Sequence, residues 1–122
     1  MANPAPGFVK NPTHTITLDK GPDVVTVLLD GKMVAATTHA VILHEDGYKQ
    51  RAYIPREEVI GTLSKNSRST HCPYKGDAAY FDLTLGETRV PDAAWSYEAP
   101  FDEMAAIEGH ISFDDRFELR IG

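Results

Sequence analysis

The chain has 122 residues, 42% of them hydrophobic and 25% charged, which is the composition of an ordinary globular domain long enough to bury a core. Its formal net charge is −6 and its 12 lysines and arginines are scattered, so nucleic-acid binding, which needs clustered cations, is not expected. No apolar run approaches the roughly 20 residues of a membrane-spanning helix, and the N-terminus lacks the basic start and apolar core of a secretory signal.

The first half of the chain indicates a proline-rich arm followed by antiparallel strands. Residues 1–12 predict a flexible arm. Residues 14–20 alternate apolar and polar side chains, as a half-buried strand does. Asp30-Gly31 is typical of a two-residue hairpin turn, and a second hairpin turn is expected at 45–47. We therefore expect a meander of sequential antiparallel strands through this half.

The second half indicates further strands interrupted by short helices. The expected elements are a short helix at 55–63, a polar loop at 64–69, strands at 77–87 and 88–98 with a bulge or edge at Pro91, a short helix at 100–109, and a closing hairpin around Asp114-Asp115. About eight short strands without long alternating helices predict a mainly β fold of antiparallel sheets with one or two short helices. Residues 13–122 are expected to form this single domain.

Four segments occur in an order and at intervals that point to a known family. They are AYIPREEV (52–59), STHCPYKGDAAYF (69–81), DAAWSYEAP (92–100) and IEGHISF (107–113). Together they resemble a family of small, mostly bacterial domains of unknown function, number four-two-seven in that series. The resemblance implies curved antiparallel sheets, similar to the topology of methionine sulfoxide reductase B, and it implies no established reaction.

The family is sometimes labelled nucleotidyltransferase-like, and the residues give that label little support. Nucleotidyl transfer needs paired carboxylates around metal ions and a loop that cradles phosphate. The chain has no glycine-rich loop of that kind, and Asp114-Asp115 falls at an expected hairpin tip. A structural zinc site would need three or four converging ligands, and the chain has one cysteine. We therefore expect no cofactor and no metal, and the one alternative left open is a looser catalytic metal using His71, His110 or Glu98.

The only cysteine, Cys72, is the candidate catalytic residue. Nearby cations such as His71 and Lys75 lower the pKa of a thiol and make it nucleophilic. A free cysteine is more often a small buried hydrophobe, so both interpretations stay open. A single cysteine allows no internal disulfide, which fits a cytoplasmic location.

Several motif residues are candidates for a ligand-binding pocket near the HCPYKG turn. Lys75 would supply a point charge for an anion and Arg56 a bidentate clamp, although both could also be ordinary surface cations. Aromatic residues would form the pocket wall or simply pack in the core, and Glu98 would be a charge at the rim. The expected pocket residues are Tyr53, Arg56, His71, Tyr74, Lys75, Trp95, Tyr97 and Glu98.

The leading functional hypothesis is a non-catalytic module that binds a small, anionic metabolite in this pocket. One alternative is an enzyme that uses Cys72 as a nucleophile or redox thiol. A second alternative is a structural or assembly domain whose motifs only specify turns and core. The sequence favours no particular oligomeric state.

Overall fold

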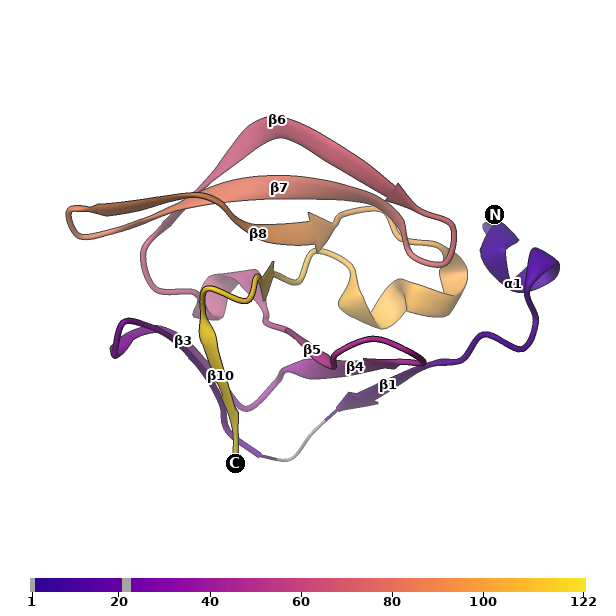
Figure 1. Ribbon diagram of the computed structural model, residues 1–122, viewed down its shortest axis with the longest axis horizontal. Coiled ribbons are helices and arrows are strands. Elements are labelled where there is room, and N and C mark those ends of the chain that lie inside the picture. The colour runs from indigo at the N-terminus through magenta and orange to yellow at the C-terminus, as the bar shows by residue number, and fades with distance from the viewer. Residues whose placement is uncertain (1, 21–22) are drawn as a thin grey trace.

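The computed structural model describes residues 2–20 and 23–122, which form a mainly β fold with three short helical segments (Figure 1). The strands are β1 (Ile16–Lys20), β2 (Val25–Leu29), β3 (Lys32–Thr37), β4 (Val41–Glu45), β5 (Arg51–Tyr53), β6 (Thr62–Cys72), β7 (Gly76–Leu85), β8 (Thr88–Tyr97), β9 (Ser112–Phe113) and β10 (Glu118–Ile121). The helical segments are α1 (Pro6–Lys10), η1 (Arg56–Glu58) and η2 (Asp102–Ile107). The predicted fold class is confirmed.

The strands form three antiparallel sheets, ordered β1-β4-β5, β10-β2-β3 and β6-β7-β8-β9. The predicted meander is wrong, because β1 pairs with β4 and not with β2. Residues 41–43 of β4 are buried, so this strand needs a neighbour on each edge, and β1 and β5 supply them. The predicted closing hairpin is also wrong, since β9 pairs with β8 whereas β10 pairs with β2.

The turns predicted from the sequence are present in the structure, whereas the predicted order of the strands is not. Asp30 and Gly31 have φ values of 50° and 79° and join β2 to β3, as expected of a two-residue hairpin. Gly47 has a φ of 82° in the turn between β4 and β5. The pairing of β7 with β8 shifts register next to Pro91, where an irregularity was expected.

Strand β6 replaces the polar loop that was predicted at 64–69. It pairs with β7 over its length, with a register shift between Lys65 and Ser69, and most of its side chains are exposed. It lies at the edge of its sheet and arches away from the rest of the molecule (Figure 1). An edge strand of this kind has no apolar face, so its sequence does not show strand periodicity. The helix expected at 55–63 is likewise reduced to the single turn η1.

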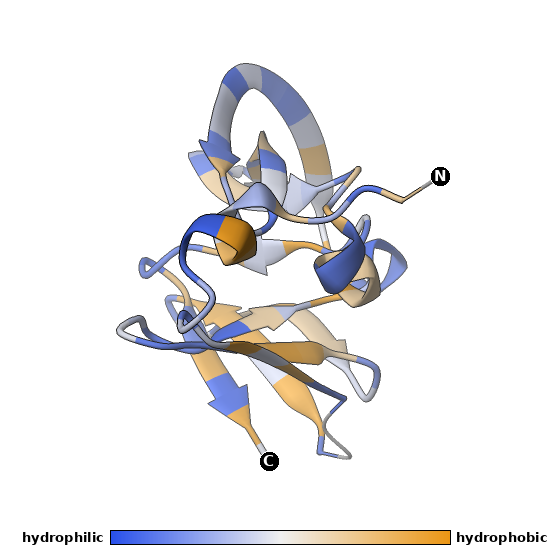
Figure 2. Cartoon of the chain, turned by 90° about the vertical axis from the view of Figure 1, so that its right-hand side faces the viewer, coloured by the Kyte–Doolittle hydropathy of each residue, from blue (hydrophilic) through white to orange (hydrophobic). Residues whose placement is uncertain are grey.

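Two apolar clusters lie on opposite faces of β7. Phe81 and Leu83 belong to the larger cluster, which the β10-β2-β3 sheet covers, and Ala78 belongs to the smaller one, formed with β4, β5 and η2. Figure 2 shows apolar strands in the lower part of the molecule and a mostly hydrophilic arch of β6 above them. Within the described residues, no helix is long and apolar enough to cross a membrane.

The proline-rich segment expected to be flexible forms α1 and packs against the turn between β6 and β7. The Gly7 amide donates to the Pro73 carbonyl at 2.9 Å, and the Phe8 ring contacts the Tyr74 ring edge-on with centroids 5.0 Å apart. Val9 is 79% exposed and takes no part in this packing.

Candidate functional site

A cleft of about 650 Å³ opens between β4 and β5 on one side and β7 and β8 on the other, and the turn after β6 closes one end. All five tyrosines and the only tryptophan of the chain line it: Tyr48, Tyr53, Tyr74, Tyr80, Trp95 and Tyr97. The phenylalanines Phe81, Phe113 and Phe117 are instead buried in the core. Tyrosine and tryptophan combine an apolar ring with a polar edge, so their concentration here makes a wall suited to a partly polar small molecule.

One wall of the cleft consists of two neighbouring aromatic side chains, each contacted by an arginine. Tyr80 and Trp95 lie opposite each other on β7 and β8. The Arg68 guanidinium lies 4.4 Å from the centre of the Tyr80 ring, and the Arg51 guanidinium lies 5.2 Å from that of Trp95. Cation–π contacts of this kind hold both guanidinium groups close to the wall.

A buried ion pair lies at the closed end of the cleft. The Lys75 ammonium donates to Glu45 at 2.6 Å, and His14 contacts the other carboxylate oxygen at 2.8 Å. Burial raises the pKa of the Glu45 carboxyl, but the hydrogen bonds from Lys75 and His14 outweigh it and hold the pKa below its ordinary value of 4.5. The charge of Lys75 is therefore compensated within the protein.

Lys49 and Arg51 share a single carboxylate oxygen. Asp115 Oδ1 accepts from Lys49 at 3.2 Å and from Arg51 at 2.9 Å. The hydrogen bond from Lys49 and the charge of Arg51 hold the pKa of Asp115 below its ordinary value. The neighbouring Asp114 is engaged by Arg116, so this pair of cations has one more positive charge than the carboxylate it contacts.

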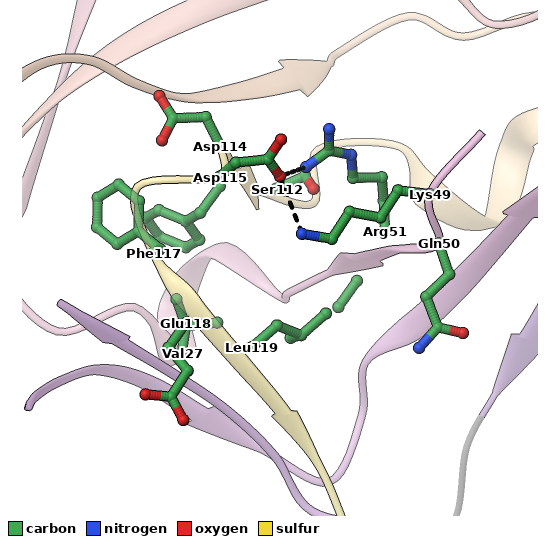
Figure 3. A pocket seen from close by; sticks show the side chains of 12 residues that line it. Val27, Lys49, Gln50, Arg51, Ser112, Asp114, Asp115, Phe117, Glu118 and Leu119 are labelled. Carbon is green, nitrogen blue, oxygen red and sulfur yellow. Dashed lines mark hydrogen bonds and ion pairs between the residues drawn. The ribbon is translucent and has the colours of Figure 1, made fainter.

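A second, smaller cavity of about 30 Å³ adjoins the cleft at these two cations, and we call it the side chamber (Figure 3). It shares Lys49, Arg51 and Asp114 with the cleft, and Ser112 is among its other lining residues. The Ser112 hydroxyl is buried and has no hydrogen-bond partner among residues 2–20 and 23–122. Ser96 is the other buried serine in this state, and it lines neither cavity.

Two tyrosine hydroxyls at the base of the cleft are held neutral by burial. The Trp95 indole N–H donates to the Tyr53 hydroxyl at 3.2 Å. Burial raises the pKa of Tyr53 to about 12, and burial together with neighbouring Tyr53 also raises the pKa of Tyr97. The shifts matter above pH 10, where an ordinary tyrosine ionises and these two stay neutral.

Cys72 is half-buried and lines the cleft beside the ion pair. The Lys75 ammonium lies 3.9 Å from its sulfur atom. His71 also lines the cleft, and its Nδ1 contacts the exposed Asp77 carboxylate at 2.7 Å.

Comparison with models of known protein families shows which family the chain belongs to. A family model described as a domain of unknown function, DUF427, matches residues 17–120. The chain belongs to this family, as its motifs predicted. A search of the curated proteins found no match.

Most of the residues predicted for a pocket in this DUF427 domain lie together in the cleft. The ones that line it are Tyr53, His71, Cys72, Tyr74, Lys75, Trp95 and Tyr97. Arg56 lies outside it, with its guanidinium 4.7 Å from the centre of the buried Phe81 ring. Glu98 also lies outside and pairs with Lys65 at 2.9 Å on the surface. Arg56 is therefore no clamp for a ligand in the cleft.

Sequence reasoning missed most of the cations of the cleft and two of its aromatic residues. They are Tyr48, Lys49, Arg51, Arg68 and Tyr80. Arg51 had a usable signal, because it stands two residues before Tyr53 on a strand and so shares its face. Arg68 had none, because the strand that carries it was not recognised. Among residues 2–20 and 23–122, no group of three or more His, Cys, Asp or Glu side chains is placed to hold a metal ion.

Proposed function

We propose that this protein is a binding module for a small, anionic metabolite, which it holds in the cleft without transforming it. The observation that carries the proposal is the gathering of all five tyrosines and the only tryptophan around one cavity. Small-molecule sites are typically concave, largely apolar and provided with a few polar groups that fix orientation. A volume of about 650 Å³ lies within the usual range for such sites.

The charge of the lining favours an anion. Four cations line the cleft (Lys49, Arg51, Arg68 and Lys75) against three carboxylates (Glu45, Asp92 and Asp114), and Asp115 at its edge pairs with both Lys49 and Arg51. Because Arg116 engages Asp114, one positive charge stays without a carboxylate of its own. This local surplus of positive charge stands out in a chain whose formal net charge is −6. A cleft of one sign with low-dielectric walls concentrates ligands of the opposite sign.

A thermal-shift screen of anionic metabolites tests the proposal. A ligand at 100 times its dissociation constant adds about 2.7 kcal/mol to the free energy of unfolding. Arg68→Gln should weaken the response, whereas Arg89→Gln is the matched control. Both arginines are exposed and pair with an aspartate, but only Arg68 lines the cleft. A hit that both substitutions weaken equally would argue against the cleft as the binding site.

A second candidate is an enzyme that uses Cys72 as its nucleophile or redox thiol. It is favoured by the position of the sulfur atom on the cleft surface, 3.9 Å from the Lys75 ammonium. Alkylation by iodoacetamide at pH 7 should then be faster than that of glutathione, and a bound ligand should slow it. A rate no greater than that of glutathione contradicts this candidate and leaves Cys72 as a packing residue.

A further inference from the structure

We infer that the side chamber, with Lys49 and Arg51, is a carboxylate subsite of the cleft, and that the ligand is an aromatic monocarboxylate. This inference rests on the proposed function and adds the chemical class of the ligand. Four features of the site carry it: a missing negative charge, a missing hydrogen-bond partner, the size of the chamber and the wall beside it.

The two cations Lys49 and Arg51 together carry one positive charge that no carboxylate neutralises. Lys49 and Arg51 contact one carboxylate oxygen between them, and Asp115 is their only acid partner among the described residues. Asp114 and Glu118 also line the chamber, but they pair with Arg116 and Arg120. The other cations of the cleft are matched, Lys75 by Glu45 at 2.6 Å and Arg68 by Asp92 at 3.7 Å. A monoanion placed at Lys49 and Arg51 would complete the pairing, and a guanidinium fork suits a planar carboxylate.

The missing partner is an acceptor for the Ser112 hydroxyl. Buried hydroxyl groups are nearly always hydrogen-bonded, and Ser112 is 1% exposed with no partner. It lines the same small chamber as the two cations, beside the Arg51–Asp115 contact (Figure 3). A ligand oxygen in the chamber would accept its hydrogen bond. The uncompensated charge of Lys49 and Arg51 and the unpartnered Ser112 hydroxyl would therefore both be satisfied by one anionic oxygen-bearing group.

The size of the chamber favours a carboxylate over a phosphate. One water-sized oxygen atom needs roughly 10–15 Å³ of such a cavity. A volume of about 30 Å³ therefore has room for a small planar group such as a carboxylate, and the bulkier tetrahedral phosphate group fits it less well. The single uncompensated charge also favours a carboxylate, because a phosphate monoester carries more than one negative charge at pH 7.

The wall beside the chamber defines the rest of the ligand. Trp95 stands next to Arg51, and Tyr80 follows it across the strand pair. A carboxylate anchored at Arg51 therefore extends its body along the row formed by Arg51, Trp95, Tyr80 and Arg68. A flat aromatic group suits this row, because it packs against ring edges and stacks on guanidinium planes.

In the absence of a ligand, the Asp115 carboxylate pairs with the two cations that would bind the ligand carboxylate. Its side chain is 65% exposed, and its oxygen occupies the donors of Lys49 and Arg51. Exposed ion pairs are weak and exchange readily, so Asp115 can give up one of the two cations to an incoming carboxylate and keep the other.

Fluorescence of Trp95 provides the binding test, because it is the only tryptophan and it lines the cleft. The probes are benzoate, phenylacetate and indole-3-carboxylate, each paired with its neutral amide, together with phenyl phosphate. We expect saturable changes with at least one carboxylate, weaker binding of its amide, and weaker binding of phenyl phosphate than of benzoate.

Two pairs of variants test the subsite itself. Ser112→Ala should weaken binding of the carboxylate roughly tenfold, as loss of a hydrogen bond to a charged group does, while Ser96→Ala, the other unpartnered buried serine, leaves it unchanged. Asp115→Asn should tighten binding several-fold by removing the competing carboxylate, while Glu87→Gln, the same charge change in the turn before β8, does not.

The outcomes separate this inference from the proposed function. If an anion binds and Arg68→Gln weakens it, but Ser112→Ala and Asp115→Asn change nothing, the cleft is the site and the carboxylate subsite is wrong. Equal affinity for the acid and its amide, or tighter binding of phenyl phosphate, also overturns the inference alone. If no probe and no metabolite changes Trp95 fluorescence, both proposals fail.

Discussion

Tyr53 is the residue whose ionisation reports most directly on the base of the cleft. Its hydroxyl is buried and accepts a hydrogen bond from Trp95, and its pKa is raised from 10.0 to about 12. The fold thus stabilises the neutral form. This contribution to stability is complete below pH 10, where tyrosine in the unfolded chain is neutral, and is lost as the pH rises through about 12.

Alkaline titration checks this behaviour. Followed by the ultraviolet absorbance of tyrosinate, the wild-type protein should show an ionisation near pH 12 that Tyr53→Phe removes. The free energy of unfolding should fall more steeply between pH 10 and 12 in the wild type than in Tyr53→Phe. If Tyr53→Phe instead removed an ionisation near pH 10, the ordinary value for tyrosine, Tyr53 would not be held in a buried, neutral state.

The Glu45 carboxylate makes the closed end of the cleft sensitive to acid. Its pKa is lowered below 4.5 because hydrogen bonds from Lys75 and His14 outweigh its burial, so the charged form is the stabilised one. The stabilisation is present above pH 4.5 and is lost as the pH falls through the lower pKa of the folded state.

Glu45→Gln should therefore destabilise the protein by roughly 2 kcal/mol at pH 7, because it leaves the largely buried Lys75 ammonium without its partner. The variant should also lose less stability on acidification than the wild type does. Glu98→Gln is the control, since its partner Lys65 is 60% exposed and the pair contributes little. Urea unfolding at several pH values measures both, and equal effects of the two substitutions would contradict the buried pair.

For single residues, the sequence correctly indicated the motif residues that lie in the cleft, but it did not show which cations already have a partner in the protein. Tyr74, Lys75, Trp95 and Tyr97 were found because they stand in family motifs, and the structure brings them together. The cations expected to meet a ligand were Arg56 and Lys75. Whether a cation is free depends on which carboxylate lies beside it in space, and Glu45, 30 residues away along the chain, is the partner that no local pattern reveals.

Among the elements, α1 connects the N-terminal segment to the cleft. Gly7 is buried against the turn that carries Tyr74, and a Cβ atom there would lie 2.7 Å from the Tyr74 ring and 2.8 Å from the Pro73 carbonyl oxygen. The ring is flexible but the carbonyl belongs to the backbone, so any side chain at this position must displace the helix or the turn.

Gly7→Ala should consequently destabilise the protein by about 1–3 kcal/mol and loosen the docking of α1. Val9→Ala in the same helix removes a side chain that is 79% exposed, and it should have almost no effect. Hydrogen exchange of the Gly7 amide, which donates to Pro73, reports the docking. If the amide of residue 7 exchanged as slowly in Gly7→Ala as in the wild type, the helix and the turn would have accommodated the added methyl group without loss of docking.

The elements also show where periodicity is informative. Strand β7 was predicted correctly because it packs Phe81 and Leu83 into the core at alternate positions. Strand β6 was taken for a loop because its position at the edge of a sheet leaves both faces polar. An exposed strand is specified by its partner and not by its own composition.

For the whole molecule, turns and strand positions followed from the sequence, whereas the pairing order did not. Hairpin signals are local, but the pairing of β10 with β2 joins residues that are far apart along the chain. The same pairing order brings β4 and β5 opposite β7 and β8, which forms the cleft. The site is therefore a product of the long-range topology, and only its motif-bearing half could be anticipated.

The charge distribution of the molecule leads to a dependence on ionic strength. The cleft carries surplus positive charge within a chain of net charge −6, so an anion is attracted locally and repelled by the rest of the surface. Because the Debye length falls from about 10 Å at 0.1 M salt to about 3 Å at 1 M, high salt should weaken binding of a carboxylate and leave its neutral amide unaffected. Equal salt dependence of the two would exclude the charge of the cleft as the cause.

Two-dimensional amide NMR spectra, recorded during titration with the tightest-binding anion of the thermal-shift screen, test most directly whether the cleft is the binding site. We expect saturable shift changes in β4, β5 and β8 and in the turn after Cys72, with little change in β1 and β3, which line neither the cleft nor the side chamber. Shift changes confined to β1 and β3, or spectra that do not change with any anion, would contradict the cleft as the functional site.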